Sequence, residues 1–474
     1  MPLPDLPTPE RLGALLHRLA AGLLERDTAA RLALLGALAG EHVLLIGPPG
    51  TAKSELARRL HRAFAGASYF ERLLTRFSTP EELFGPLSLK SLEDDRYERL
   101  TTGFLPTAGI AFLDEVFKAN SAILNALLTL LNEREFDNGS GRQRTPLISV
   151  VGASNELPAD EALQAFFDRF LLRVPVAPVG DASFEALLRL PPAQAGEAGA
   201  SPLTEAERQA IGQAAQRVHL SAEAVAACTA LRAWLAAQGK AVSDRRWRQW
   251  VGLMRTAAAT EHRTQVDGLD LWLAPYVAGA AADEMAALAE WFEADWLHAV
   301  PQTFEWLTRA VEAFEQQLQI EQTAPPEDAA EADDAAGKLA LARAIGLGEG
   351  SDAGSAMPRL TLAGLEARMR RHYSPVHIAA RLTQTDELIG HTLAHHTALA
   401  SEALALAERL QARLWIPPHL AERWNAAHAE SLERLQALLA RLQQARAGFA
   451  ELPVDEALPA IAPAPVPLEE PATA

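Results

Sequence analysis

The chain has 474 residues, of which 49% are apolar, and a formal net charge of −18. This length suggests about three domains, and the acidity argues against a nucleic-acid-binding protein, whose surface is usually basic. The single cysteine, Cys228, excludes a disulfide framework within the chain and fits a reducing compartment. No signal-peptide pattern and no run of about 18 apolar residues is found, so we expect a cytoplasmic protein with only peripheral or partner-mediated membrane contact.

The first 180 residues predict an α/β domain. A helix is expected to begin at Pro9, with Thr8 as its cap, and a second helix follows Asp27. Short apolar runs then fit buried strands, and segments with helical periodicity lie between them. The candidate strands are residues 43–46, 110–113, 147–151 and 171–174, and the helices between them include 54–64 and 121–132. Strands that alternate with helices predict a parallel sheet with helices on its faces.

After Pro178 the pattern becomes helical. Residues 181–300 show no strand pattern and predict an all-α lid. Its expected helices are residues 205–217, 222–237, 244–258 and 269–274, the last of them ended by Pro275. Helix is expected to continue to about Glu321.

The last third predicts a helical C-terminal domain in residues 301–321 and 359–452. Residues 322–358 are rich in acid, proline and glycine, which indicates a flexible linker. Two long helices, 385–414 and 418–449, are joined at residues 416–418 and form a helical hairpin. Residues 453–474 alternate proline with alanine and acid, so we expect a disordered tail.

The strongest local motif is an eight-residue loop between a predicted strand and a predicted helix. It reads Gly47, Pro48, Pro49, Gly50, Thr51, Ala52, Lys53, Ser54. This context predicts a phosphate-binding loop, in which backbone N–H groups and the helix N-terminus face phosphate oxygens. Lys53 would reach the β- and γ-phosphates of ATP, and the Ser54 hydroxyl would bind Mg²⁺. Ala52 replaces the glycine of the strict pattern, so the loop alone is a moderate signal.

Two acids about sixty residues further on strengthen this interpretation. Asp114 and Glu115 end an apolar strand. A phosphate-loop enzyme needs a carboxylate there to hold Mg²⁺ through water, which suits Asp114. Glu115 would then orient and polarise the attacking water. The sequence therefore predicts a nucleotide hydrolase that uses ATP; another nucleoside triphosphate stays an alternative, because nothing in these motifs reads the base.

Two further residues fit the same chemistry. Asn155 ends another apolar strand, and its amide could hold the attacking water if the strands are neighbours. Arg169 follows in the sequence Phe-Asp-Arg-Phe and could stabilise transition-state charge if it reached a phosphate.

With these residues assembled, the chain resembles the MoxR branch of the AAA+ ATPases, and within it the RavA type. The resemblance covers residues 8–300. Besides the loop, the acids and Asn155, it is carried by residues 75–86, 118–119, 125–128, 132–134, 153–158 and 243–247.

The resemblance implies roles by position. Asp114 and Glu115 are similar to the Walker B pair and Asn155 to sensor 1. Arg169 is similar to the arginine finger, which acts on a neighbour's nucleotide, and Arg245 to sensor 2 in the lid, with the adjacent Arg246 as an alternative. The family pattern is a homo-hexamer.

Members of this family resemble remodelling chaperones and usually work with a von Willebrand factor A (vWA) protein. This chain has no metal-adhesion signature, so that partner would be a separate protein, and the client is not identified by the sequence. The small β-rich domain of the RavA type has no counterpart here, so a lysine decarboxylase interaction is not expected. The alternatives are a nucleic-acid-stimulated motor, which the acidity disfavours, and a nucleotide-binding scaffold, which Glu115 disfavours.

Overall fold

The computed structural model describes residues 6–139, 141–158, 160–190, 201–325 and 370–467. The chain divides into two compact units, residues 1–298 with 409–422, and residues 299–408 with 423–474. Within the described ranges, no helix combines the length and apolar character needed to cross a membrane.

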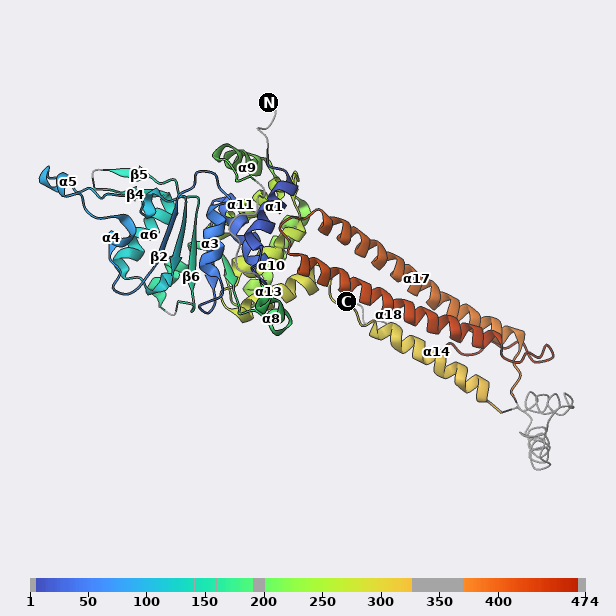
Figure 1. Cartoon of the computed structure of the whole chain (residues 1–474). Helices are drawn as coiled ribbons and strands as arrows, with labels where there is room; N and C mark the ends of the chain where they lie inside the picture. The colour runs from blue at the N-terminus through green and yellow to red at the C-terminus, as the bar shows by residue number, and fades with distance from the viewer. Residues whose placement is uncertain (1–5, 140, 159, 191–200, 326–369, 468–474) are drawn as a thin grey trace. The chain divides into compact units, whose positions relative to one another are not determined.

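The first unit is built on a sheet of five parallel strands in the order β2-β3-β6-β1-β7. Figure 1 shows the strands of this sheet, with β2 and β6 labelled. The strands are β1 His42–Ile46, β2 Tyr69–Leu73, β3 Ile110–Asp114, β6 Ser149–Ser154 and β7 Phe170–Pro175. The predicted parallel sheet is confirmed. The edge strand β2 was not predicted, because its sequence, Tyr-Phe-Glu-Arg-Leu, lacks the continuous apolar run of a central strand.

Helices cover both faces of this sheet. Gly36 of α2 lies against Val43 and Leu172, so α2 covers one face. Leu44 points the opposite way from Val43 and packs in a core cluster with Ile123 of α6. The helices of this part are α1 Pro9–Ala20, α2 Asp27–Ala39, α3 Lys53–His61, α4 Pro80–Phe84, α5 Leu89–Glu93, α6 Ser121–Glu133, α7 Glu161–Phe167 and α8 Asp181–Leu188. A small antiparallel pair, β4 Glu135–Asp137 and β5 Arg142–Arg144, follows α6.

The lid follows in the same unit and is mainly helical, as predicted. Its helices are α9 Glu205–Arg217, α10 Ala222–Ala237, α11 Asp244–Thr260, α12 Ala274–Ala278 and α13 Ala282–Trp291, with a 3₁₀ segment at Gly268–Leu273 and a π-helical turn at Phe292–Trp296. Two short strands, β8 His219–Leu220 and β9 Gln265–Val266, pair in parallel and were not predicted. The prediction that Pro275 ends a helix is wrong. Pro275 lies in the first turn of α12, where the missing N–H of proline costs nothing.

The turn of the C-terminal hairpin belongs to the first unit, not to the helices that it joins. The buried side chain of Arg413 forms ion pairs with Glu261, Asp267 and Asp270 of the lid. The indole N–H of Trp415, a residue with 1% of its surface exposed, donates to the Thr260 hydroxyl at 2.8 Å. These contacts fix residues 409–422 to the lid.

The second unit contains α14 Glu305–Thr323, α17 Pro375–Gln411 and α18 Pro418–Ala450. Val311 and Phe314 of α14 share a core cluster with Leu388 of α17 and Leu435 of α18. Residues 453–467 differ from the expected disordered tail, because Val466 is buried in the same cluster. Most of the predicted linker, from residue 326 onward, lies outside the described residues, as does the end of the predicted tail, residues 468–474.

Candidate functional site

The predicted phosphate-binding loop follows β1 and is held on both sides. The Gly47 N–H donates to the carbonyl of Ser154, the last residue of β6, at 2.9 Å. On the other side, the Val176 N–H donates to the Ile46 carbonyl at 2.7 Å. A Cβ at Gly47 would lie 2.0 Å from the Val176 carbonyl oxygen, so this position requires glycine.

The loop enters α3 through left-handed backbone. Gly50 has φ 80°, and Ala52, directly before the helix, has φ 65° and ψ 23°. Alanine adopts this conformation at a cost of roughly 1–2 kcal/mol, whereas glycine does so freely. Successive N–H groups beside a left-handed residue form a concave anion site. Ala52 therefore departs from the strict sequence pattern but keeps the backbone shape that the pattern serves.

Lys53, the first residue of α3, lies across this loop. Its Nζ donates to the Gly47 carbonyl at 2.7 Å and to the Pro48 carbonyl at 2.8 Å. Burial lowers the pKa of this ammonium, and the charges of Asp114 and Glu115 act in the opposite direction. The lysine of the loop and the two acids therefore share one electrostatic environment.

Arg26, which the sequence analysis did not single out, also holds the loop. Its buried guanidinium donates to the Thr51 carbonyl at 3.1 Å and to the Ala177 carbonyl at 2.5 Å. Both acceptors are main-chain groups, so no pattern of side chains in the sequence could have indicated this contact. Arg26 ties the loop to the chain that leaves β7.

The two acids lie at the end of β3. Burial raises the pKa of Asp114, with a smaller opposing contribution from the Glu115 N–H, which donates to Asp114 Oδ1 at 3.0 Å. Glu115 has φ 50° and ψ 45°, a conformation that non-glycine residues adopt at a cost and that is often found at functional sites. This turn directs the backbone of Glu115 away from the strand.

Both carboxylate oxygens of Glu115 have a partner. The Asn155 amide donates to Oε1 at 2.6 Å, and the Lys118 ammonium lies 3.2 Å from Oε2. The predicted proximity of Asn155 to the acids is thus present in the structure, because β6, which precedes Asn155, pairs with β3.

The carboxyl edge of the sheet therefore gathers most of the predicted site. The strand order places the ends of β3, β6 and β1 side by side, and with them Asp114, Glu115, Asn155 and the loop. The donor set fits Mg²⁺ and phosphate: carboxylate and hydroxyl oxygens suit a hard cation, and a glycine-bearing N–H cradle with a lysine suits phosphate. Ser54, the second residue of α3, completes this set.

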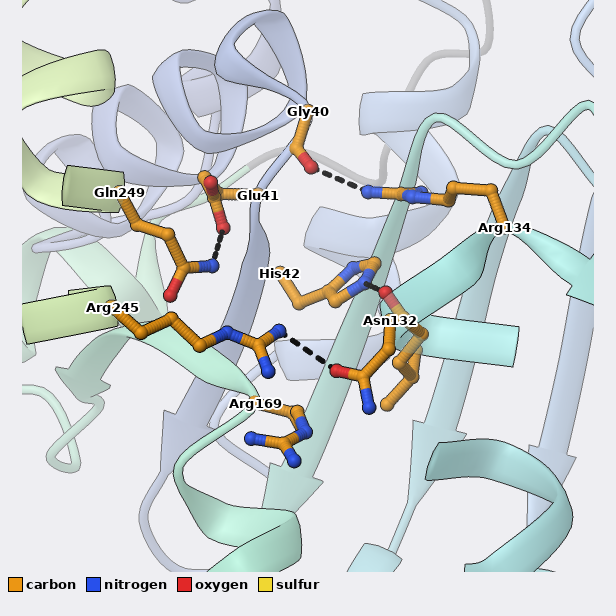
Figure 2. A pocket seen from close by; sticks show the side chains of 9 residues that line it. Gly40, Glu41, His42, Asn132, Arg134, Arg169, Arg245 and Gln249 are labelled. Atoms are coloured by element: carbon orange, nitrogen blue, oxygen red, sulfur yellow. Dashed lines mark hydrogen bonds between the residues drawn. The ribbon is translucent and has the colours of Figure 1, made fainter. Parts of the chain in front are cut away.

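Arg169 and Arg245 lie elsewhere, at the amino edge of the sheet. Both line a polar cavity of about 120 Å³ beside Glu41 and His42, where β1 begins (Figure 2). The loop follows the other end of β1, and a five-residue strand spans roughly 15 Å. The two arginines therefore line a cavity at the opposite end of β1 from the phosphate-binding loop of their own chain.

The two adjacent lid arginines differ in what they contact. Arg246 is buried, and its guanidinium donates five hydrogen bonds to acceptors on Val277, Asp168, Phe170 and Leu171. Arg245 is exposed and donates to the Asn132 side chain at 2.8 Å. Arg246 therefore holds the lid to the start of β7, whereas the Arg245 side chain stays exposed.

Glu41 gives the cavity its acidic group. The Gln249 amide donates to its carboxylate at 2.7 Å, and burial raises the pKa of Glu41 to about 7, against the attraction of Arg134. Neighbouring His42 accepts from the Val150 N–H through Nδ1, so its Nε2 carries the proton and donates to the Leu131 carbonyl. Burial lowers the pKa of His42, which makes it a neutral structural group.

The chain matches two family descriptions. Residues 10–211 match the MoxR domain of the MoxR-vWA-beta-propeller ternary systems, and residues 223–292 match an AAA lid domain. The two matched ranges together cover the sheet, the loop and most of the lid, but not residues 212–222 between them.

Similar proteins are found in several organisms. The chain is 41% identical over 262 residues to the uncharacterized protein MJ0812 of Methanocaldococcus jannaschii, covering 55% of this chain and 69% of that protein. It is 54% identical over 164 residues to protein MJ0079 of the same organism, covering 34% of this chain and 43% of the relative. It is 32% identical over 153 residues to Protein MoxR of Paracoccus denitrificans, covering 31% of this chain and 44% of that protein. With the fold, the site and these matches in agreement, the chain belongs to the MoxR family of AAA+ ATPases.

Proposed function

We propose that this protein hydrolyses ATP with Mg²⁺ at the carboxyl edge of its sheet. The observation that carries the proposal is the arrangement of Lys53, Asp114, Glu115 and Asn155 around one loop. Lys53 and the loop amides would bind the phosphates, and Ser54 and Asp114 would hold Mg²⁺, which neutralises charge on the phosphates. Glu115 would orient and polarise water, and Asn155 would hold the Glu115 carboxylate in place.

Arg169 and Arg245 complete the proposed site from a second copy. They line one cavity at the opposite edge of the sheet from the loop, so a single chain cannot supply them to its own nucleotide without rearrangement. An arginine supplied by a neighbour stabilises the charge that develops on the transferred phosphoryl group. We propose a ring, with six copies as in the family pattern, in which each copy completes the site of the next.

The matched MoxR description names systems that combine MoxR, vWA and β-propeller proteins. This supports a separate vWA protein as partner and a remodelling role on a protein client. The assignment to the RavA type stays a prediction from the sequence, because it depends on the resemblance of the loop and neighbouring motifs and the matched family description names only MoxR.

Mixing two inactive variants tests the proposal. Arg169→Ala keeps an intact loop, and Lys53→Ala keeps an intact arginine. Each variant alone should lose ATPase activity by on the order of a hundredfold or more. A mixture of the two should recover part of the wild-type rate, because the arginine of one copy can then serve the loop of the other. Phosphate release measured across mixing ratios checks this.

The matched control is Lys53→Ala mixed with Lys53→Ala,Arg169→Ala, which should stay inactive at every ratio. A mixture of the two single variants that remains as inactive as its components contradicts action between copies. Wild-type protein without Mg²⁺-dependent ATP hydrolysis contradicts the proposed function altogether.

A further inference from the structure

Helix α8, which follows the last strand of the sheet and precedes the lid in the chain, has an apolar face that no described residue buries. None of its residues is buried. Phe184, Leu187 and Leu188 follow the i, i+3, i+4 spacing of a single helix face and are 52%, 39% and 71% exposed. Adjacent exposed apolar side chains of this size mark an interaction surface more often than a single exposed leucine does.

This helix is attached to the phosphate-binding loop. The Glu25 carboxylate accepts the Gly180 N–H just before α8, with N–O distances of 3.1 and 3.3 Å. The next residue, Arg26, donates to the carbonyls of Thr51 in the loop and Ala177 after β7. Residues 25–26 therefore join the loop and the start of α8, which lies at the carboxyl edge.

A surface groove of about 330 Å³ lies along α11, the helix that carries Arg245. Its lining comes from that helix alone: Trp247, Arg248, Val251, Gly252 and Arg255. A Cβ at Gly252 would meet nothing within 4 Å, so packing within the chain does not require glycine there. Glycine inside a helix costs about 1 kcal/mol relative to alanine. The absence of a side chain at Gly252 leaves space in the groove that a side chain of another molecule would fill.

The groove and the α8 face differ in charge. No described carboxylate pairs with Arg248 or Arg255, and the Nε of Arg255 is buried without a hydrogen-bond partner. The α8 face is flanked by the exposed Asp181 and by Glu185, whose ion-pair partner among the described residues is the exposed Arg189 just after the helix. The acidic residues beside the apolar α8 face are therefore opposite in charge to the arginines beside the apolar groove, so the two surfaces are complementary.

We propose that the α8 face of one copy of this chain docks into the α11 groove of a second copy. The inference rests on the proposed function, because it names the contact through which arginines reach a neighbour's nucleotide. The α8 face is joined to the loop at the carboxyl edge, and the groove is on the helix whose Arg245 lines the cavity at the amino edge. Two different surfaces meet, so the contact is head-to-tail and can repeat until a ring closes.

A contact of this kind acts as the hot spot of a larger interface. Three apolar side chains bury far less than the roughly 1,600 Å² of a standard interface, so flanking surfaces must also meet. Phe184 is the largest apolar group on the face and the best candidate for an anchor over Gly252. Losing such an anchor weakens association on the order of 30-fold.

Cysteine cross-linking between different chains tests the contact directly. Leu188→Cys and Gly252→Cys are made separately in a Cys228→Ala background. The native thiol is half-buried, and burial raises its pKa to about 11, so its removal mainly guards against side reactions. The two single-cysteine proteins are mixed with Mg²⁺ and ATP and oxidised. Non-reducing electrophoresis should show a cross-linked dimer only in the mixture.

Two results would overturn the docking proposal. One is a mixture without cross-linking although the wild-type protein assembles under the same conditions. The other is cross-linking of Leu188→Cys to itself, which would mean a two-fold contact between α8 helices. If the wild-type protein stays monomeric in the presence of Mg²⁺ and ATP, both the docking proposal and the proposed ring are wrong.

A second variant keeps the test independent of cysteine chemistry. Phe184→Ala should raise the protein concentration for half-maximal assembly, measured by sedimentation, on the order of 30-fold. The matched control is Val225→Ala, which shortens another half-exposed apolar side chain of the same unit and should change nothing. If Phe184→Ala assembles like the control while Arg169→Ala and Lys53→Ala still complement each other, docking is wrong and the proposed function stands.

Discussion

The two edges of the parallel sheet carry opposite kinds of chemistry. At the carboxyl edge, Lys53 donates to carbonyls of the loop, and Glu115 is held by the Asn155 amide and the Lys118 ammonium, so these charged groups already have partners within the chain. At the amino edge, Arg169 and Arg245 line a cavity beside Glu41, and the Nε of Arg169 is buried without a hydrogen-bond partner. We infer that one edge binds and activates a substrate while the other stabilises charge on another copy's substrate.

The largest effect is expected at the carboxyl edge. Glu115→Gln should lower the maximal ATPase rate by about 10²–10⁴-fold while ATP still binds, because the amide keeps the side-chain shape but cannot polarise water. Steady-state kinetics and binding of a fluorescent nucleotide measure the two properties separately. A variant that hydrolyses ATP at the wild-type rate would remove Glu115 from the proposed chemistry.

Asn155→Ala is the companion of that variant. It removes the 2.6 Å hydrogen bond to Glu115 and leaves the carboxylate intact. A smaller loss of rate than in Glu115→Gln is expected, since the carboxylate is then less well oriented but still present. Equal losses would mean that Asn155 acts on the reacting groups itself.

The next effect separates the two lid arginines. Arg246→Ala should lower the free energy of unfolding of the first unit by on the order of 3 kcal/mol, because it removes the buried hydrogen bonds to Asp168 and to the carbonyls of Val277, Phe170 and Leu171. Arg245→Ala should change it by about 0.5 kcal/mol or less, because that side chain is exposed. Urea unfolding of both variants measures the difference. Equal destabilisation would contradict the assignment of Arg246 as the structural arginine.

Glu41 should make stability depend on pH. Its pKa is raised to about 7 in the folded protein, above the usual value near 4.5. The folded state therefore holds the proton more tightly, and the free energy of unfolding should fall as pH rises from about 4.5 to 7 and then level off. Arg134, Arg245, Arg246 and the Gln249 amide favour the charged form, so the fall should be about 1–3 kcal/mol. Glu41→Gln should lack this slope in urea unfolding at pH 5 and pH 8.

The smallest effect concerns the loop itself. Ala52→Gly should change the free energy of unfolding by about 1 kcal/mol or less, because relief of the left-handed φ is offset by the greater freedom of glycine in the unfolded chain. Thermal unfolding checks this. A loss of several kcal/mol would show that the Ala52 methyl group makes packing contacts of its own.

Sequence reasoning could predict the elements whose signals are local. The central strands are continuous apolar runs, and Thr8 caps α1 as the sequence indicates, accepting the Arg11 N–H. The edge strand β2 was missed because polar residues interrupt its apolar pattern. Pro275 was misread because a proline in the first turn of a helix and one that ends a helix look alike in sequence.

In the site, too, the residues with local sequence signals could be predicted, and those that depend on tertiary contacts could not. The proximity of Asp114, Glu115 and Asn155 could be predicted, because they stand at the ends of apolar strands and parallel strands bring their carboxyl ends together. Arg26 could not be found, because its acceptors are carbonyls far away in the chain. Which of Arg245 and Arg246 is buried also needed the structure, since the two neighbours look alike in sequence and only packing separates them.

Because the lid holds the hairpin turn, residues 1–298 alone do not make up the complete first unit of this protein. A fragment that ends at residue 298 would lack Arg413 and Trp415, and would leave the carboxylates of Glu261 and Asp270 with Arg263 as their remaining ion-pair partner. The first unit is therefore not one continuous segment of the gene. A recombination event or an engineered truncation that transfers the nucleotide-binding region intact must also carry residues 409–422, and with them the helices on either side.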